Sequence, residues 1–229
     1  MEKFSGVVFD LDETLTNGLD PMTGETVDIH FVSWKQASKE LDVEITEEVY
    51  QKQIRGKANY IIDDWFANEF DREGFKVSSV KEPIYINEVI PKYLAFLPEV
   101  EGSLNGLLEK QVPMGIVTNA PGPSFAKVYE YLKLNRWFPR ELCICLQDAL
   151  DLGYRAKPDP EGLLDMSDRL KVDLPELIFV GDTVSDMYTA NSAGVCGVGV
   201  RGATDEVDLI EAGAYACIST FDELSSYLV

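Results

Sequence analysis

Six short apolar runs are the feature of this 229-residue chain that most constrains its fold. Each run is continuous rather than alternating, which is typical of strands buried on both faces. Amphipathic helical patterns separate the runs. The apolar runs are Gly6–Phe9, Met114–Val117, Leu142–Leu146, Leu177–Val180, Val195–Val200 and Ala214–Ile218, and the helical patterns are Val100–Lys110, Ser124–Leu132, Pro160–Leu170, Asp186–Ala193, Glu206–Ala212 and Asp222–Leu228. This alternation predicts an α/β fold with a Rossmann-like, three-layer core around a parallel sheet.

Residues 16–92 have a different texture. This stretch is polar and helical in pattern, for example over Phe31–Leu41, Glu47–Ile54 and Tyr60–Phe70. It interrupts the alternation directly after the first apolar run. We therefore expect two domains, a core formed by residues 1–15 and 93–229 and an inserted all-helical cap formed by residues 16–92.

The charge balance limits the classes of partner. Lys and Arg number 20, Asp and Glu number 40, and the net charge is −20. Such a surface repels phosphate backbones and anionic lipid heads, so we expect neither nucleic acid nor membrane partners. No apolar run reaches the ~18–20 residues of a membrane span. With no signal-peptide pattern, no C-x-x-C pair among four cysteines and one histidine, we expect a cytoplasmic protein without a zinc site.

Polar residues collect where the predicted strands end, which is where open parallel sheets form their sites. Asp10 and Asp12 follow the first strand and face the same way if the chain stays extended. One could attack phosphorus and the other could act as general acid; the alternative is a pair of turn aspartates. Thr118 and Asn119 follow the second strand, where they either bind a phosphoryl oxygen or form a plain turn.

Two further groups complete the pattern. Lys157 precedes a proline pair that introduces a helix, and it either stabilises a phosphoryl group or is an ordinary surface lysine. Asp182 and Asp186 are four positions apart at a helix start, where they either hold Mg²⁺ or, in the case of Asp182, cap the helix. Taken together, these groups would place four aspartates in one pocket, and so many anions require a divalent cation.

These residues, in this order, resemble the haloacid dehalogenase superfamily. Its pattern is D-x-D-x-T, then Ser or Thr after a strand, then Lys, then G-D-x-x-x-D. The corresponding residues are Asp10 to Thr14, Thr118-Asn119, Lys157-Pro158 and Gly181-Asp182 to Asp186. The similarity spans nearly the whole chain.

The resemblance implies a role for each residue of the core pattern. Asp10 would be the nucleophile and a metal ligand, and Asp12 the acid/base with its backbone carbonyl on Mg²⁺. Thr118 and Lys157 would hold the phosphoryl group. Asp182 would bind Mg²⁺ directly and Asp186 would orient a metal-bound water.

The insertion resembles the helical cap of the phosphoglycolate phosphatase and β-phosphoglucomutase group. Within it, His30, Arg55 and Lys57 match a first cap helix and a substrate-facing loop, which implies substrate-binding roles beside Asn119. Two features depart from the group. Glu13 stands where glycine is usual, and residues 17–25 are about ten longer than the usual hinge.

The sequence therefore predicts a Mg²⁺-dependent phosphatase that hydrolyses a small anionic phosphorylated metabolite through an aspartyl-phosphate on Asp10. Phosphoglycolate, a sugar phosphate and a nucleoside monophosphate all remain open. A β-phosphoglucomutase-like hexose-phosphate mutase is the alternative, although Thr118-Asn119-Ala120 looks more like phosphatases. A receiver-type signalling module and a binding protein without activity are the rivals from other classes. The oligomeric state is open.

Overall fold

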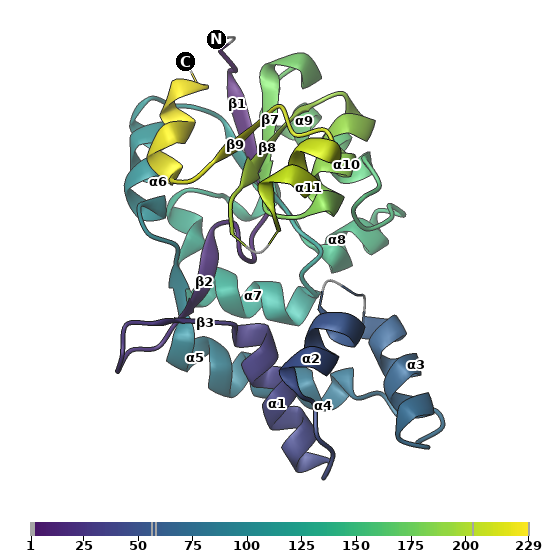
Figure 1. Cartoon of the computed structure of the whole chain (residues 1–229). Helices are drawn as coiled ribbons and strands as arrows, with labels where there is room; N and C mark the ends of the chain where they lie inside the picture. Colours follow the sequence, from purple (N-terminus) through teal and green to yellow (C-terminus); the bar gives the residue numbers. More distant parts are fainter. Residues whose placement is uncertain (1–2, 56, 58, 203, 229) are drawn as a thin grey trace. The chain divides into compact units, whose positions relative to one another are not determined.

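The computed structural model describes residues 3–55, 57, 59–202 and 204–228. The chain divides into two compact units (Figure 1). The core unit comprises Met1–Asn17 and Phe96–Val229, and the inserted unit comprises Gly18–Ala95. In the described part of the chain, no helix is both long and apolar enough to cross a bilayer.

A six-stranded sheet organises the core unit, with strand order β6-β5-β1-β7-β8-β9. All five pairs of neighbouring strands run parallel, which confirms the predicted parallel sheet. The strands are β1 (Gly6–Phe9), β5 (Met114–Val117), β6 (Cys143–Ile144), β7 (Leu177–Gly181), β8 (Cys196–Val200) and β9 (Ala216–Ile218). Strand β1 lies between β5 and β7, so the chain order reverses direction around it.

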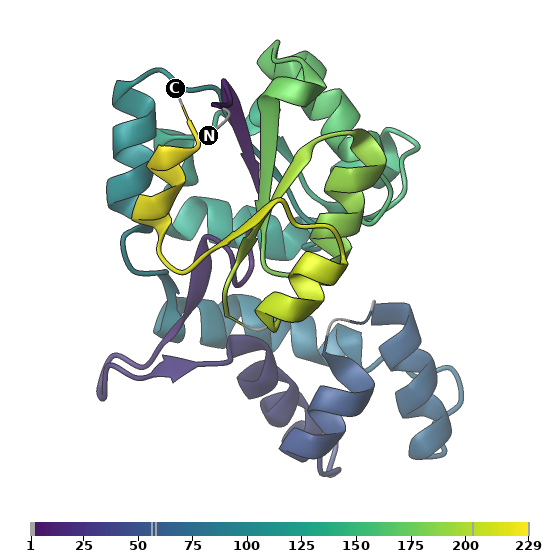
Figure 2. The same ribbon diagram turned by 45° about the horizontal axis from the view of Figure 1, so that its top comes forward.

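Helices follow the strands and cover both faces of this sheet (Figure 2). They are α6 (Val100–Glu109), α7 (Gly122–Tyr131), α8 (Leu146–Asp151), α9 (Glu161–Leu170), α10 (Val184–Ala193) and α11 (Glu206–Glu211), with 3-10 turns at Leu134–Arg136, Arg140–Leu142, Leu174–Glu176 and Phe221–Ser226. The last of these turns replaces the amphipathic helix expected over Asp222–Leu228.

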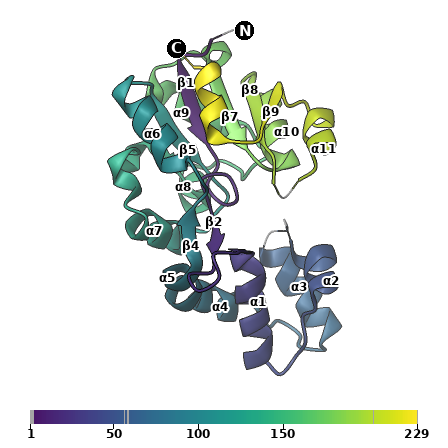
Figure 3. The ribbon, with the colours of Figure 1, turned by 60° about the vertical axis from the view of Figure 1, so that its left-hand side comes forward.

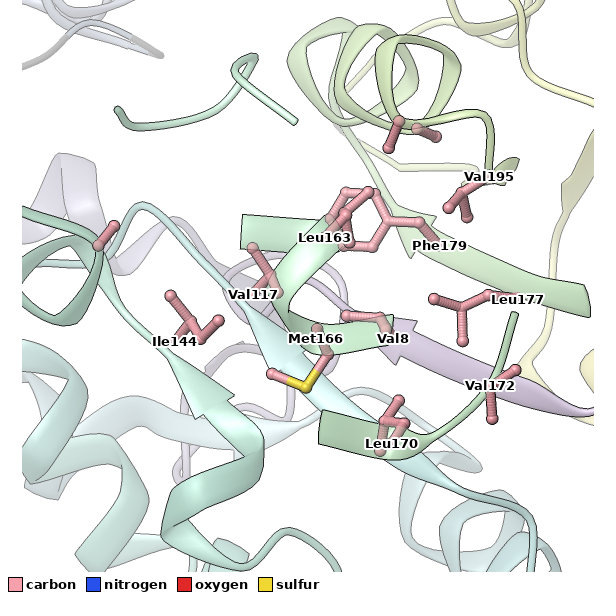
Figure 4. Close-up of a cluster of buried hydrophobic side chains, with 13 residues drawn as sticks. Val8, Val117, Ile144, Leu163, Met166, Leu170, Val172, Leu177, Phe179 and Val195 are labelled. Atoms are coloured by element: carbon pink, nitrogen blue, oxygen red, sulfur yellow. The ribbon is translucent and has the colours of Figure 1, made fainter. Parts of the chain in front are cut away.

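The continuous apolar pattern of β1 has a direct structural cause. Val8 belongs to a buried cluster in which strand side chains such as Phe179 pack against Leu163 and Met166 of α9 (Figure 4). The neighbouring Phe9 instead contacts Phe138 edge-on at 5.9 Å and Phe221 at 6.2 Å. Successive strand residues point to opposite faces, so a sheet covered on both faces needs apolar residues at every position.

The inserted unit is helical over most of its length. Its elements are α1 (Ile29–Glu40), α2 (Glu47–Val49), a π-helical turn at Tyr50–Ile54, α3 (Asn59–Glu69), α4 (Ser78–Ile84), a second π-helical turn at Tyr85–Val89, and α5 (Ile90–Tyr93). Asp28 caps α1 by accepting a hydrogen bond from the Phe31 backbone N–H at 2.8 Å. Trp34, Tyr50 and Phe66 are buried in a hydrophobic cluster of this unit.

Residues 16–27 differ from the expected all-helical insertion. They form an antiparallel hairpin of β2 (Thr16–Leu19) and β3 (Thr26–Val27), and β2 also neighbours β4 (Leu94–Phe96) in a three-stranded sheet (Figure 3). Asp20 organises the connecting turn by accepting a hydrogen bond from the Met22 N–H at 2.8 Å. Gly18 is required because a Cβ there would overlap the Val27 carbonyl oxygen. The long hinge segment is therefore spent on a hairpin.

Candidate active site

Three adjacent parallel strands end at the predicted site. Asp10 follows β1, Thr118 follows β5 and Asp182 follows β7. The Asp10 backbone N–H donates to the Val180 carbonyl at 2.9 Å, so the pairing of β1 and β7 continues to the first carboxylate. The Thr118 N–H likewise donates to the Ile144 carbonyl at 2.9 Å. The sheet itself therefore sets the positions of these backbones.

Asp10, Asp182 and Asp186 form a buried carboxylate cluster. One carboxylate oxygen from each residue lies within 4.8 Å of the others. Burial, reinforced by the charge of Asp186, raises the pKa of Asp10, although Lys157 opposes the shift. Burial raises the pKa of Asp182 well above its ordinary value, and the charges of Asp10 and Asp186 add to this. Oxygen ligands of this kind suit Mg²⁺, whose charge would relieve their mutual repulsion.

Lys157 neutralises only part of this charge. Its Nζ lies 2.6 Å from Asp10 Oδ1 and 2.6 Å from Asp186 Oδ1, and its side chain is 6% exposed. Burial alone would lower the pKa of Lys157, but the two carboxylates outweigh it and raise the pKa above its usual value. One ammonium among three carboxylates leaves the cluster with charge to spare for a metal cation.

Two threonines support the carboxylates, and the sequence interpretation had assigned neither a role. Thr14 Oγ1 donates to Asp182 Oδ1 at 3.0 Å. Thr183 Oγ1 donates to Asp186 Oδ2 at 2.6 Å, and the Asp186 N–H donates back to Thr183 Oγ1 at 3.2 Å. Thr183 is therefore the N-cap of α10, and helix capping by Asp182 is wrong. The Thr183-to-Asp186 spacing is that of a capping box, which could have signalled this pairing.

The loop after β5 contacts the lysine loop. Thr118 is buried, and its Oγ1 accepts a hydrogen bond from the Ala120 N–H at 3.2 Å. Asn119 Nδ2 donates to the Lys157 carbonyl at 3.1 Å, and the Lys157 N–H donates to Asn119 Oδ1 at 2.9 Å. The sequence had suggested substrate binding for Asn119, and its pairing with the Lys157 backbone had no sequence signal.

A family model decides the relationship that this geometry suggests. The model of the haloacid dehalogenase-like hydrolases matches residues 4–194. The chain belongs to this family. It is therefore a hydrolase, which favours the enzyme over the signalling-module and silent-binder alternatives.

Known proteins agree with this assignment. Phosphoglycolate phosphatase from Escherichia coli K12 is 28% identical over 220 residues, covering 87% of this hydrolase and 82% of that enzyme. A predicted phosphoglycolate phosphatase from Haemophilus somnus has a TM-score of 0.78 at 21% identity, with coverage of 99% and 98%. A family hydrolase from Deinococcus radiodurans R1, with bound phosphate and sodium, has a TM-score of 0.75 at 18% identity, with coverage of 98% and 94%. The two structures show that the fold is shared.

Asp12 and Glu13 lie in the turn that leaves β1. Asp12 is half-buried and forms an isolated bridge with Thr16, and it is not one of the three clustered carboxylates. Glu13 has φ +57°. Left-handed backbone of this kind favours glycine, which explains why Glu13 is unusual in this hydrolase.

The three cap candidates lie in the inserted unit. His30 stacks on Tyr85 with ring centroids 5.0 Å apart, and burial, helped by the charges of Lys81 and Arg55, lowers its pKa to about 3. Arg55 donates to a glutamine side chain one helical turn earlier, and Lys57 Nζ donates to a backbone carbonyl at 2.7 Å. Gly56 of the same loop lies outside the described residues. Their substrate-binding roles stay predictions.

Proposed function

We propose that this hydrolase is a Mg²⁺-dependent phosphatase acting on small phosphomonoesters of the phosphoglycolate or sugar-phosphate class. One observation carries the proposal: Lys157 Nζ bridges Asp10 and Asp186 inside a cluster of three buried carboxylates at the end of β1. A fixed ammonium beside a carboxylate nucleophile is what phosphoryl transfer requires. The Escherichia coli relative, named as a phosphoglycolate phosphatase, supports the substrate class.

In this proposal Asp10 is the nucleophile. One carboxylate oxygen forms a bond to phosphorus as the bond to the leaving oxygen breaks, which gives an aspartyl-phosphate and an alcohol. Asp12 gives its proton to the leaving oxygen. It then takes a proton from the water that hydrolyses the aspartyl-phosphate and releases phosphate. Lys157 and Thr118 hold the phosphoryl oxygens.

The carboxylate cluster fits a resident magnesium ion. Asp10, Asp182 and the Asp12 backbone carbonyl would ligate it, and Asp186 would orient a bound water. When bound, Mg²⁺ supplies positive charge that offsets the phosphoryl oxygens and the three carboxylates. His30, Arg55 and Lys57 of the inserted unit are proposed to set specificity for an anionic substrate.

The test is phosphate release from a panel of small phosphomonoesters, with Mg²⁺ and with EDTA. We expect release that requires both Mg²⁺ and Asp10, so Asp10→Asn should be silent. Asp165→Asn is the matched control, because Asp165 pairs with Arg169 on α9 at 2.7 Å and holds no proposed role. Release that survives both EDTA and Asp10→Asn would contradict the mechanism. Isomerisation of β-glucose 1-phosphate in the presence of its bisphosphate, without release, would establish the mutase instead.

A further inference from the structure

We propose that Asn119 is a positioning residue for Lys157 rather than a substrate-binding residue. Its side-chain amide holds the Lys157 peptide and so fixes where the ammonium can reach. The inference rests on the proposed phosphatase function, because it concerns the lysine that would stabilise the transferred phosphoryl group.

The contact is a two-point bridge between one side chain and one backbone residue. Asn119 Nδ2 donates to the Lys157 carbonyl oxygen at 3.1 Å, and the Lys157 N–H donates to Asn119 Oδ1 at 2.9 Å. The two residues are 38 positions apart. The amide thus satisfies both backbone polar groups of Lys157, as a neighbouring strand would.

Lys157 needs such support because it lies in irregular chain. Residues 152–160, between α8 and α9, form no helix or strand. A lysine has a flexible four-carbon stem, so its ammonium is well placed only if the backbone is held. The ammonium is held separately by Asp10 and Asp186, each at 2.6 Å. Asn119 supplies the constraint at the other end of the side chain.

Asn119 is itself on a firm base. It directly follows Thr118, whose N–H donates to the Ile144 carbonyl at 2.9 Å and whose Oγ1 accepts from the Ala120 N–H. The Leu146 N–H donates to the Ala120 carbonyl at 3.1 Å, which joins this loop to the start of α8. The bridge therefore transmits the position of the central sheet to the lysine loop.

A positioning role and a substrate contact predict different kinetics. An amide that acts through Lys157 should affect every phosphomonoester alike, because all share the phosphoryl group. An amide that contacts the organic part of the substrate should affect some substrates and spare others, and should act mainly on KM.

The first experiment measures kcat and KM of Asn119→Ala with the best metabolite of the panel and with p-nitrophenyl phosphate. We expect kcat to fall about 10- to 100-fold for both, because small misplacements of a catalytic group have effects of this size. KM should change less than about threefold. Asn119→Asp should lose as much, since it keeps the acceptor for the Lys157 N–H but places a carboxylate against the Lys157 carbonyl.

Asn191→Ala is the matched control. Asn191 Nδ2 also ties a distant backbone, donating to the Ala212 carbonyl at 2.7 Å, but outside the proposed site. It should lower Tm and leave kcat unchanged, which separates lost stability from lost positioning. A kcat loss in Asn191→Ala as large as that in Asn119→Ala would overturn the inference.

The second experiment is a double-mutant cycle with Lys157→Ala, read as the Kd of inorganic phosphate in the presence of Mg²⁺, which needs no turnover. Each single variant should weaken phosphate binding about tenfold, and the double variant should be no weaker than Lys157→Ala. Additive losses, or a loss confined to one substrate, would overturn the inference.

The outcomes also separate this inference from the proposed function. If the unaltered enzyme releases no phosphate, the function fails. If it is active, Asp10→Asn is silent and Asn119→Ala is fully active, only the inference fails.

Discussion

The two units each bury an ionisable centre, and burial shifts them in opposite directions. In the core unit, burial raises the pKa of Asp10 and Asp182, and neighbouring carboxylates add to the rise. In the inserted unit, burial lowers the pKa of His30 to about 3, and the positive charges of Lys81 and Arg55 add to the fall. One principle covers both, because burial disfavours whichever form is charged.

The difference lies in what can relieve each centre. A divalent cation can neutralise the carboxylate cluster, so the stability of the core unit should depend on Mg²⁺. No cation helps His30, which is already neutral near pH 7 and stacked on Tyr85. The stability of the inserted unit should therefore depend on pH. Five predictions test this contrast.

The largest effect is expected from Asp182→Asn on activity. Removing one carboxylate weakens the metal site, and metal chemistry is worth several kcal/mol, so phosphate release should fall about 10³-fold. The increase in Tm on adding Mg²⁺ should also shrink. Full activity with an undiminished Mg²⁺ response would show that Asp182 does not belong to the metal site.

Gly18→Ala should destabilise the inserted unit by about 2–4 kcal/mol, because the new methyl group overlaps the Val27 carbonyl oxygen and the Ile29 side chain. Urea unfolding followed by fluorescence measures this. Gly24→Ala is the control, since φ is +74° but nothing lies within 4 Å, and it should lose only about 1 kcal/mol. The Mg²⁺-induced rise in stability should survive in both variants. Its loss in Gly18→Ala would mean that the contrast between the units does not hold.

His30 should make the protein less stable in mild acid. Its folded pKa of about 3 lies below the ordinary 6.5, so between these values the unfolded chain binds the proton and stability falls as pH falls. At pH 5 the loss is up to about 2 kcal/mol. The control is His30→Gln, which loses the stacking at every pH but should show a shallower decline between pH 7 and pH 5. Equal pH slopes in the two proteins would contradict the assignment.

Without metal, Asp182→Asn should stabilise the fold by about 1 kcal/mol at pH 7. A carboxyl group whose folded pKa is raised binds more protons in the folded state, so its stability is lost as pH rises through the folded pKa. The amide removes that loss. Asp63→Asn is the matched control, because buried Asp63 accepts from the Ser78 N–H at 2.8 Å and Oγ at 2.7 Å. It should destabilise instead. Destabilisation by both, measured in EDTA, would argue against the raised pKa of Asp182.

The smallest effect is expected from Glu13→Gly, at about 0.5–1 kcal/mol of added stability. The change relieves φ +57° and removes a charge that raises the pKa of Asp182. Lys171→Gly relieves the same φ of +57° on exposed chain without that charge effect. A larger gain for Glu13→Gly in EDTA than with Mg²⁺ would show the electrostatic part. Equal gains under both conditions would leave only the backbone strain.

Parts of the fold were predictable because their signals are local. The strand preceding Asp10 was predicted over the residues that the structure assigns to it, since continuous apolar runs depend only on burial on both faces. The hairpin at 16–27 was missed. Its strands of four and two residues carry no clear alternation, and only the contact between Gly18 and Val27 shows why they pair.

By itself, the sequence determined which residues sit at the strand ends and that they match a hydrolase family, because both properties are read along the chain. Only the tertiary structure decided which of those residues touch. Lys157 meets Asp10 across 147 positions, Thr14 meets Asp182 across 168, and Asn119 turns to the Lys157 backbone. The physical reason is that each short polar side chain takes the partner that the packed sheet and its loops bring within hydrogen-bond distance, and that packing has no local signature.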